Sequence, residues 1–537
     1  MKRTATKLGI LGAVLSMIGI LSCACGVPPG KACLEMGRAH RVNLVGAAGA
    51  EEREEARTGA DGETVFNTET YDHVVDNPFV NTADDPRSTF SIDVDTASYA
   101  NVRRFLDHGR LPPKGAVRIE EMINYFDYDY APPEGDEPFA VHMEAARCPW
   151  DLSHKLVLIG LKGRVIEKES RPPSNLVFLL DVSGSMGARN KLPLLQRSMK
   201  MMVRQLGEND RVSIVTYAGR EALVLPSTPA SPPGPVLAAI DDLRSGGSTH
   251  GSAGIQRAYE QARRHHVEGG VNRVILATDG DFNVGVTSQS ELIDLVRAQA
   301  ASGVFLTVLG FGMGNYKDST LEKLADKGNG MYAYIDTLNE TKKVLVDQLS
   351  GTLITIAKDV KIQVEFNPLA VRAWRLIGYE NRVLAHQDFN DDEKDAGEIG
   401  AGHTVTALYE IVPASAKRKG PRVDPLKYQE GLKPSAAAYH GELLTLKLRH
   451  KHPEGLKSRL QSFALQDEIL DFASASENFR FASAVAAFGM LLRDSPHKGN
   501  ASLQGVKEMA AGCLGGDRHG FRAEFLTLVH KATGLSR

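Results

Sequence analysis

The sequence contains little cysteine and little tryptophan. It has five cysteines and two tryptophans among 537 residues. The cysteines are Cys23, Cys25, Cys33, Cys148 and Cys513. They are sparse and lack the spacing of metal ligands, which argues against a cysteine-based metal site and leaves disulfide pairing open. A chain of this length needs more than one hydrophobic core, and we expect two to four domains.

An excess of one charge is also missing. The 63 lysines and arginines nearly balance the 66 acidic residues, and no basic stripe is visible. This balance argues against a nucleic-acid partner. The sequence also lacks an HExxH zinc motif, a GxSxG elbow and a GK[ST] phosphate loop. These absences predict that the protein is not an enzyme.

The only long apolar run stands at the beginning of the chain. Lys2, Arg3 and Lys7 precede an apolar stretch from Leu8 to Leu21. The stretch is too short to span a bilayer comfortably and has the order of charge, apolar core and small residues found in an export signal. An ordinary cleaved signal is one interpretation of this segment.

The residues after the apolar run indicate a second interpretation. Ile20-Leu21-Ser22-Cys23 resembles the lipobox of bacterial lipoproteins, and Cys25 is a second candidate. The resemblance implies removal of residues 1–22, acylation of Cys23 and anchoring at a membrane surface. For a Gram-negative host it favours the outer membrane. Residues 23–64 are rich in Gly, Ala, Glu and Arg, and we expect a flexible tether.

The rest of the chain changes its pattern twice. Residues 65–170 mix short strands and helices and predict an α+β domain. Residues 171–350 alternate buried strands with helices, which predicts a doubly wound, mostly parallel α/β sheet. Residues 351–537 predict antiparallel strands followed by helices, and the first of these helices is expected from about Phe463.

Oxygen-bearing side chains follow several strands of the predicted parallel sheet. Asp181, Ser183 and Ser185 come directly after the first strand, Asp279 follows a later one, and Thr249 stands in a glycine-rich turn that opens a helix. Ligands bind at the carboxyl ends of strands in such sheets, so we expect these side chains on one rim. All-oxygen ligation favours Mg²⁺, with Ca²⁺ or Mn²⁺ as alternatives. The incomplete shell leaves room for an outside oxygen, which a carboxylate of a partner can supply.

This spacing resembles the metal-ion-dependent adhesion site of the von Willebrand factor type A family. In the resemblance, Asp181, Ser183, Ser185, Thr249 and Asp279 hold the ion directly or through water. Beyond this site, the chain from about residue 65 is similar to a bacterial group of exported type A proteins with conserved flanking domains. Four segments carry this likeness: Ser91–Thr96, Glu120–Phe126, Gly378–Arg382 and Asn478–Ser483.

The resemblance implies an envelope-associated protein that binds an acidic residue of a protein partner through the cation. A structural scaffold, in which the metal only stabilises the rim, is the alternative. A third hypothesis is a hydrolase that uses Ser183 or Ser185.

Two acidic groups elsewhere are weaker candidates for metal sites. Asp93 and Asp95, with Ser98, are expected to end a strand and cap the following helix rather than bind a metal. The acids between Asp388 and Asp395 lack the spacing of a calcium loop and predict a solvated loop.

Overall fold

The computed structural model describes residues 57–58, 64–65 and 69–536, apart from 219–220, 248–250, 281–288, 315–316, 417–426 and 428–432. The predicted signal, Cys23 and most of the predicted tether lie outside the described residues. Two short strands, β1 (Arg57–Thr58) and β2 (Thr64–Val65), pair antiparallel within the tether region. No helix in the described part of the chain combines the length and apolar character needed to cross a bilayer.

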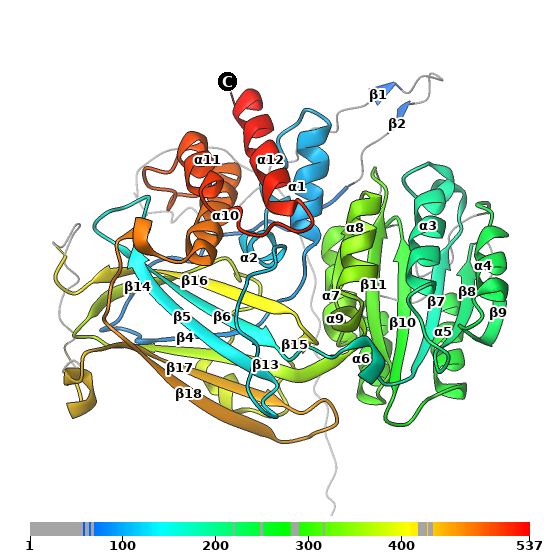
Figure 1. The fold of residues 1–537 in the computed structure, drawn as a ribbon, viewed down its shortest axis with the longest axis horizontal. Coiled ribbons are helices and arrows are strands. Elements are labelled where there is room, and N and C mark those ends of the chain that lie inside the picture. Colours follow the sequence, from blue (N-terminus) through cyan, green and yellow to red (C-terminus); the bar gives the residue numbers. More distant parts are fainter. Residues whose placement is uncertain are drawn as a thin grey trace, which may run out of the picture. The chain divides into compact units, whose positions relative to one another are not determined.

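The middle of the chain forms the predicted α/β domain (Figure 1). Its sheet has the order β12-β11-β10-β7-β8-β9, and all neighbours are parallel except β8 and β9. The strands are β7 (Ser174–Asp181), β8 (Arg211–Tyr217), β9 (Glu221–Pro229), β10 (Val271–Thr278), β11 (Phe305–Phe311) and β12 (Tyr332–Ile335). This arrangement confirms the predicted doubly wound sheet and adds the antiparallel edge strand β9.

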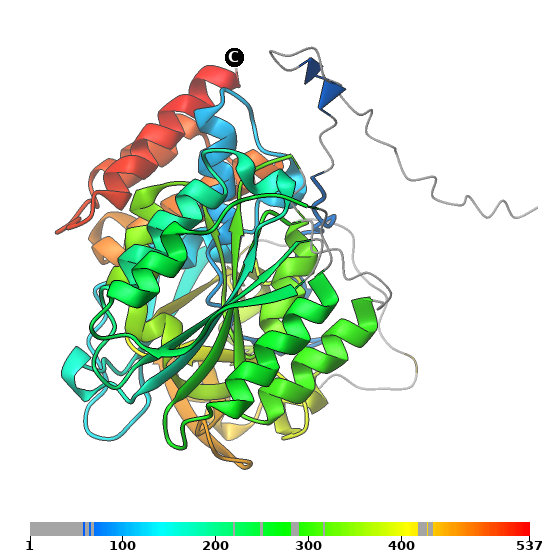
Figure 2. The same cartoon turned by 90° about the vertical axis from the view of Figure 1, so that its right-hand side faces the viewer.

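Helices cover both faces of this sheet, as the view in Figure 2 shows. They are α3 (Leu192–Val203), α4 (Gly234–Asp241), α5 (Gly251–Arg264), α6 (Gln289–Ala301), α7 (Asp318–Lys327), α8 (Leu338–Lys342) and α9 (Leu349–Leu353), with a π-helical turn, η4 (Lys343–Asp347), between the last two. Alternate residues of β7 point to opposite faces, as the pleat of a strand requires. Phe178 belongs to the core that contains Leu195 of α3, whereas Leu179 belongs to the core that contains Ala258 of α5.

The segments before and after the α/β domain share two antiparallel sheets. One has the order β15-β13-β17-β18, with β4 also paired to β13, and the other has the order β3-β14-β16-β6-β5. The strands from the first segment are β3 (Val80–Asn81), β4 (Arg87–Ser91), β5 (Phe139–Arg147) and β6 (Lys155–Gly163). Those from the second are β13 (Thr355–Phe366), β14 (Val371–Ile377), β15 (Gly397–Gly400), β16 (Thr404–Pro413), β17 (Glu442–Lys451) and β18 (Ser458–Gln466).

Helices from both segments also share one core. They are α1 (Ala97–Asp107), α2 (Ile119–Asn124), α10 (Glu477–Arg493), α11 (Leu503–Ala511) and α12 (Phe521–Leu535). The expected helical start near Phe463 is wrong. Phe463 lies in β18, where it pairs with Leu446 of β17, and the helix begins only at Glu477. The antiparallel strands followed by helices are otherwise confirmed.

The α/β domain is therefore an insertion in sequence. The chain enters it after β6 and leaves it from α9 directly into β13, while β6 pairs with β16 and β4 pairs with β13. The boundaries near residues 170 and 350 stay predictions. The pairing shows that the flanking segments complete each other's sheets.

Candidate metal site

Two carboxylates lie buried where neighbouring strands of the α/β sheet end. Asp181 is the last residue of β7, and Asp279 follows β10, which pairs with β7 in parallel. Neither side chain is exposed to solvent. Because parallel neighbours end on the same rim, the strand order brings both carboxylates to one edge of the sheet.

Hydrogen bonds of the Asp181 carboxylate and of the backbone hold the turn after Asp181. Asp181 Oδ1 accepts a hydrogen bond from the N–H of Ser183 at 2.8 Å, and Oδ2 accepts one from the Thr278 hydroxyl at 3.3 Å. The N–H of Gly184 donates to the carbonyl of Gly247 at 3.0 Å. The glycine turn that precedes Thr249 therefore lies against the Asp181 turn. Thr249 itself lies outside the described residues.

The two serine hydroxyls fit a shared small cation. Ser183 Oγ and Ser185 Oγ share a hydrogen bond of 3.0 Å. Two adjacent ligands of an octahedral Mg²⁺ at about 2.1 Å stand about 3.0 Å apart, since the separation is √2 times the bond length. The donors present are all oxygens, as a hard cation requires. Ser183 is buried and Ser185 is exposed, so the rim is accessible from solvent at Ser185.

Burial also governs the charge of this rim. It raises the pKa of Asp181 to about 6, and the neighbouring Asp279 carboxylate adds to the rise. A buried anion that lacks a nearby cation favours protonation, and a bound cation has the opposite effect. The donor set and its charge therefore fit a divalent ion.

Sequence reasoning missed a residue of this rim. The ammonium of Lys191 donates to Asp279 Oδ2 at 2.8 Å, and the lysine is almost fully buried. Lys191 immediately precedes α3 and is ten residues beyond Asp181. The sequence signal that points to Lys191 as a rim residue is its position next to a helix start on the predicted rim.

Three of the four segments that carry the family likeness, Ser91–Thr96, Glu120–Phe126 and Gly378–Arg382, meet in a buried network of charges, here called the junction network. Its members are Asp93, Asp95, Arg118, Glu121, Asp318, Glu322, Asp326 and Arg382. They come from both flanking segments and from α7 of the α/β domain. Carboxylate oxygens of Asp93, Asp95, Glu121 and Glu322 lie within 4.8 Å of one another.

The expectation that Asp93 and Asp95 cap the following helix is wrong. Both carboxylates instead accept hydrogen bonds from Arg382, at 3.2 Å and 3.3 Å. The N–H of Ser98, in the first turn of α1, donates to Glu121 of α2 at 2.8 Å. The buried guanidinium attracts the two aspartates, and the helix start receives a carboxylate from another helix.

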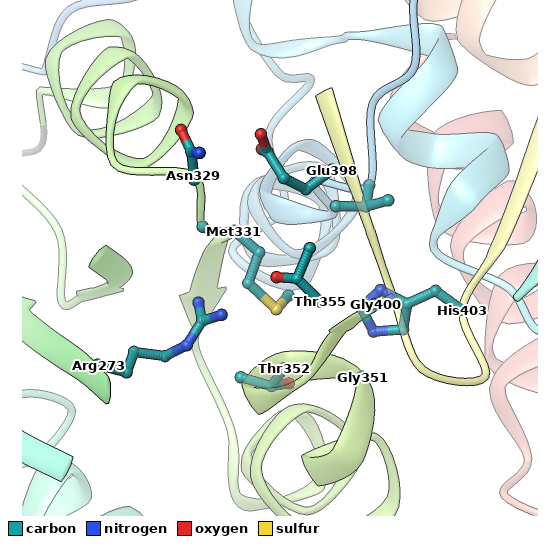
Figure 3. Close-up of a pocket in the computed structure, with 11 residues that line it drawn as sticks. Arg273, Asn329, Met331, Gly351, Thr352, Thr355, Glu398, Gly400 and His403 are labelled. Atoms are coloured by element: carbon teal, nitrogen blue, oxygen red, sulfur yellow. The ribbon is translucent and has the colours of Figure 1, made fainter. Parts of the chain in front are cut away.

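A small pocket lies between the other end of the sheet and the flanking sheets. Arg273, near the start of β10, and His403 stand on opposite sides of it, with Met331 between them in Figure 3. Its cavity volume of about 20 Å³ suits about one water molecule. Burial lowers the pKa of His403 to about 4 and that of Arg273 to about 10. The pocket is too small for an organic ligand.

Comparisons with known proteins follow the same division of the chain. The family described as "von Willebrand factor type A domain" matches residues 175–348 and "Uncharacterized protein YfbK, C-terminal" matches residues 351–535. The family described as "von Willebrand factor" matches residues 65–158. "Uncharacterized protein YfbK" of Escherichia coli (strain K12) is 44% identical over 476 residues, which cover 87% of this chain and 82% of that protein. The chain belongs to the YfbK family of von Willebrand factor type A proteins.

Two more distant matches cover part of the chain or have low identity. Inter-alpha-trypsin inhibitor heavy chain H3 of Bos taurus is 29% identical over 172 residues, 30% of this chain and 18% of its own. The solved structure "von Willebrand factor type A from Catenulispora acidiphila" shares 13% identity over 74% of this chain and 91% of its own, with a TM-score of 0.41. The predicted type A family is confirmed, while export and lipidation stay predictions.

Proposed function

We propose that the chain is an envelope-associated binding protein that recognises a protein partner through a divalent cation. Type A domains commonly mediate contacts between proteins, and the cation in this proposal is held by Asp181, Ser183, Ser185, Thr249 and Asp279. Mg²⁺ is the favoured ion, with Ca²⁺ and Mn²⁺ as alternatives. The observation that carries the proposal is the 3.0 Å separation of the Ser183 and Ser185 hydroxyl oxygens beside two buried carboxylates.

Each residue has a separate task in this proposal. Asp181 holds the turn through the N–H of Ser183, which keeps both serine hydroxyls on the rim. Ser185 stands at the exposed side, where a partner can approach. When bound, the ion supplies a Lewis-acidic position for an oxygen of the partner. An acidic side chain is the partner group that we propose, because the carboxylate oxygen is a hard, charged donor.

The remaining parts of the proposal concern location and chemistry. Acylation of Cys23 would anchor the chain at a membrane surface, with the tether as a spacer. We propose no catalytic activity, since the binding hypothesis needs only coordination. Acylation can be tested by mass spectrometry of the chain isolated from a producing bacterium, where an unmodified Cys23 would contradict it.

Calorimetric titration of Mg²⁺ into the purified full chain tests the metal site. Asp181→Asn keeps the shape of the side chain and removes its charge, and we expect it to abolish binding. Asp241→Asn is the matched control, because Asp241 is exposed on α4 and pairs with Lys200. Equal binding by the wild type and Asp181→Asn would refute this site.

The scaffold alternative makes a different prediction. If the ion only stiffens the rim, Mg²⁺ raises the melting temperature of the wild type but does not alter which proteins are captured from an envelope extract. If the binding proposal holds, EDTA and Asp181→Asn remove the same captured protein. Capture that survives both treatments would contradict metal-bridged recognition.

A further inference from the structure

Lys191 places a fixed positive charge inside the candidate metal site. Its ammonium donates to Asp279 Oδ2 at 2.8 Å, and only 8% of the residue is exposed. Such burial restricts the ammonium to the carboxylate that it contacts. The pair is therefore part of the rim and differs from a surface salt bridge, in which both side chains move freely in water.

The fold makes room for this lysine at one glycine. Gly312 follows β11 and has a backbone φ of +76°, a conformation that suits glycine. A Cβ atom at Gly312 would lie 2.4–2.8 Å from three carbons of the Lys191 side chain. The lysine stem therefore runs directly over Gly312, and this close passage positions the ammonium at Asp279.

The lysine changes the charge that a cation meets. The serine ligands are neutral, so Asp181 and Asp279 supply the negative charge among the described residues of the proposed ligand set. Lys191 offsets one of these two charges. A divalent ion bound beside the intact Lys191–Asp279 pair is then left with about one uncompensated positive charge, which an anionic ligand can neutralise.

We propose that Lys191 couples cation binding at this site to the binding of a carboxylate, so that each is weak without the other. This inference rests on the proposed function and specifies how its partner is selected. A neutral oxygen donor can fill the open position but leaves the charge uncompensated. A carboxylate fills the position and balances the charge, which favours acidic side chains over amides.

The alternative is that the arriving ion displaces the ammonium from Asp279. The ion would then meet both carboxylates without the opposing ammonium and would bind tightly without any anion. The two cases differ in how the affinity for Mg²⁺ responds to a small carboxylate and to the loss of Lys191.

Calorimetric titration of Mg²⁺ into the purified full chain can separate them. Titrations are made at one ionic strength in the presence of excess acetate or of its neutral analogue acetamide. We expect acetate, but not acetamide, to tighten Mg²⁺ binding by the wild type about tenfold or more. No difference between acetate and acetamide would overturn the inference.

Lys191→Met is the decisive variant, since methionine keeps an unbranched apolar stem over Gly312 and removes the charge. We expect Lys191→Met to bind Mg²⁺ alone about ten- to hundredfold more tightly than the wild type, and to lose most of the acetate effect. Lys200→Met is the control, because Lys200 lies on α3, the helix that Lys191 precedes, but pairs with Asp241 away from the rim. Gly312→Ala, which crowds the lysine stem, should shift Mg²⁺ affinity in the same direction as Lys191→Met.

The outcomes separate this inference from the proposed function. Mg²⁺ binding that Asp181→Asn abolishes and Lys191→Met leaves unchanged would refute the role of Lys191 and retain the metal site. An absence of binding by the wild type and by both variants, with or without acetate, would refute both proposals. Circular dichroism and thermal melting identify a variant that has failed to fold, in which case the acetate and acetamide comparison on the wild type decides.

Discussion

Arg382 joins three parts of the chain at one buried point, and its removal should destabilise the fold strongly. Its guanidinium donates to Asp93 at 3.2 Å, Asp95 at 3.3 Å and Glu322 at 3.4 Å, and it also contacts Asp326. Only 9% of the Arg382 side chain is exposed. Replacement by methionine would leave several buried carboxylates without this cation.

The expected magnitude follows from this burial. Removing one partner of a buried ion pair costs about 3–5 kcal/mol, a large share of the roughly 5–15 kcal/mol that stabilises a typical fold. Arg147→Met is the matched control. Arg147 pairs with Asp471, and their side chains are 61% and 75% exposed. A pair of this kind contributes about 0–1 kcal/mol.

Urea denaturation followed by circular dichroism would compare both variants with the wild type at pH 8 and pH 5. We expect Arg382→Met to lose several times more free energy of unfolding than Arg147→Met at pH 8. Burial raises the pKa values of Asp95 and Glu322, so these groups take up protons more readily at pH 5 and the cost of losing Arg382 should shrink. An Arg382→Met variant as stable as Arg147→Met at pH 8 would refute this reasoning.

Two further predictions concern stability. Burial, with the nearby Glu380 and Asp93 carboxylates, raises the pKa of Glu120 to about 8. Its stabilising contribution is complete below the unfolded value near 4.5 and is lost as the pH rises toward 8, by up to about 1.4 kcal/mol per pH unit. Glu120→Gln should remove this loss, and identical pH profiles for variant and wild type would contradict it. Phe525 of α12 packs its ring against Phe126, Phe481 and Phe488, so Phe525→Ala should cost about 3–5 kcal/mol in urea denaturation; a loss below about 1 kcal/mol would show that α12 contributes little to this core.

The sequence is most informative where a local pattern of residues also determines the place of the segment in the fold. The apolar runs at Asn175–Leu180 and Val274–Thr278 predict buried parallel strands, and both strands lie in the centre of the sheet. The positions of Asp181 and Asp279 after these strands predict one shared rim, because strand direction alone determines that edge. Local pattern and strand order were therefore sufficient for most of the candidate site.

Partners that are distant in sequence were beyond such reasoning. Arg382 contacts Asp93 across 289 residues, and Lys191 contacts Asp279 across 88 residues. Neither ion pair produces a periodic pattern in the sequence from which it could be predicted. The helix expected from about Phe463 is wrong over the last four residues of β18 for a related reason, since β18 alternates only partly in burial and is held by pairing with β17.

The pairing of β6 with β16 imposes an order of events during synthesis. Ile159 pairs with Ala407, so 407 − 159 = 248 residues separate the partners. At about 5–20 residues per second, the ribosome needs roughly 12–50 s to supply the second strand after the first. During that interval β6 has a hydrogen-bonding edge with no native partner, while the whole α/β domain is completed. A ribosome that stops after the α/β domain thus releases a chain with an open strand edge, which is a site for aggregation or for chaperone binding.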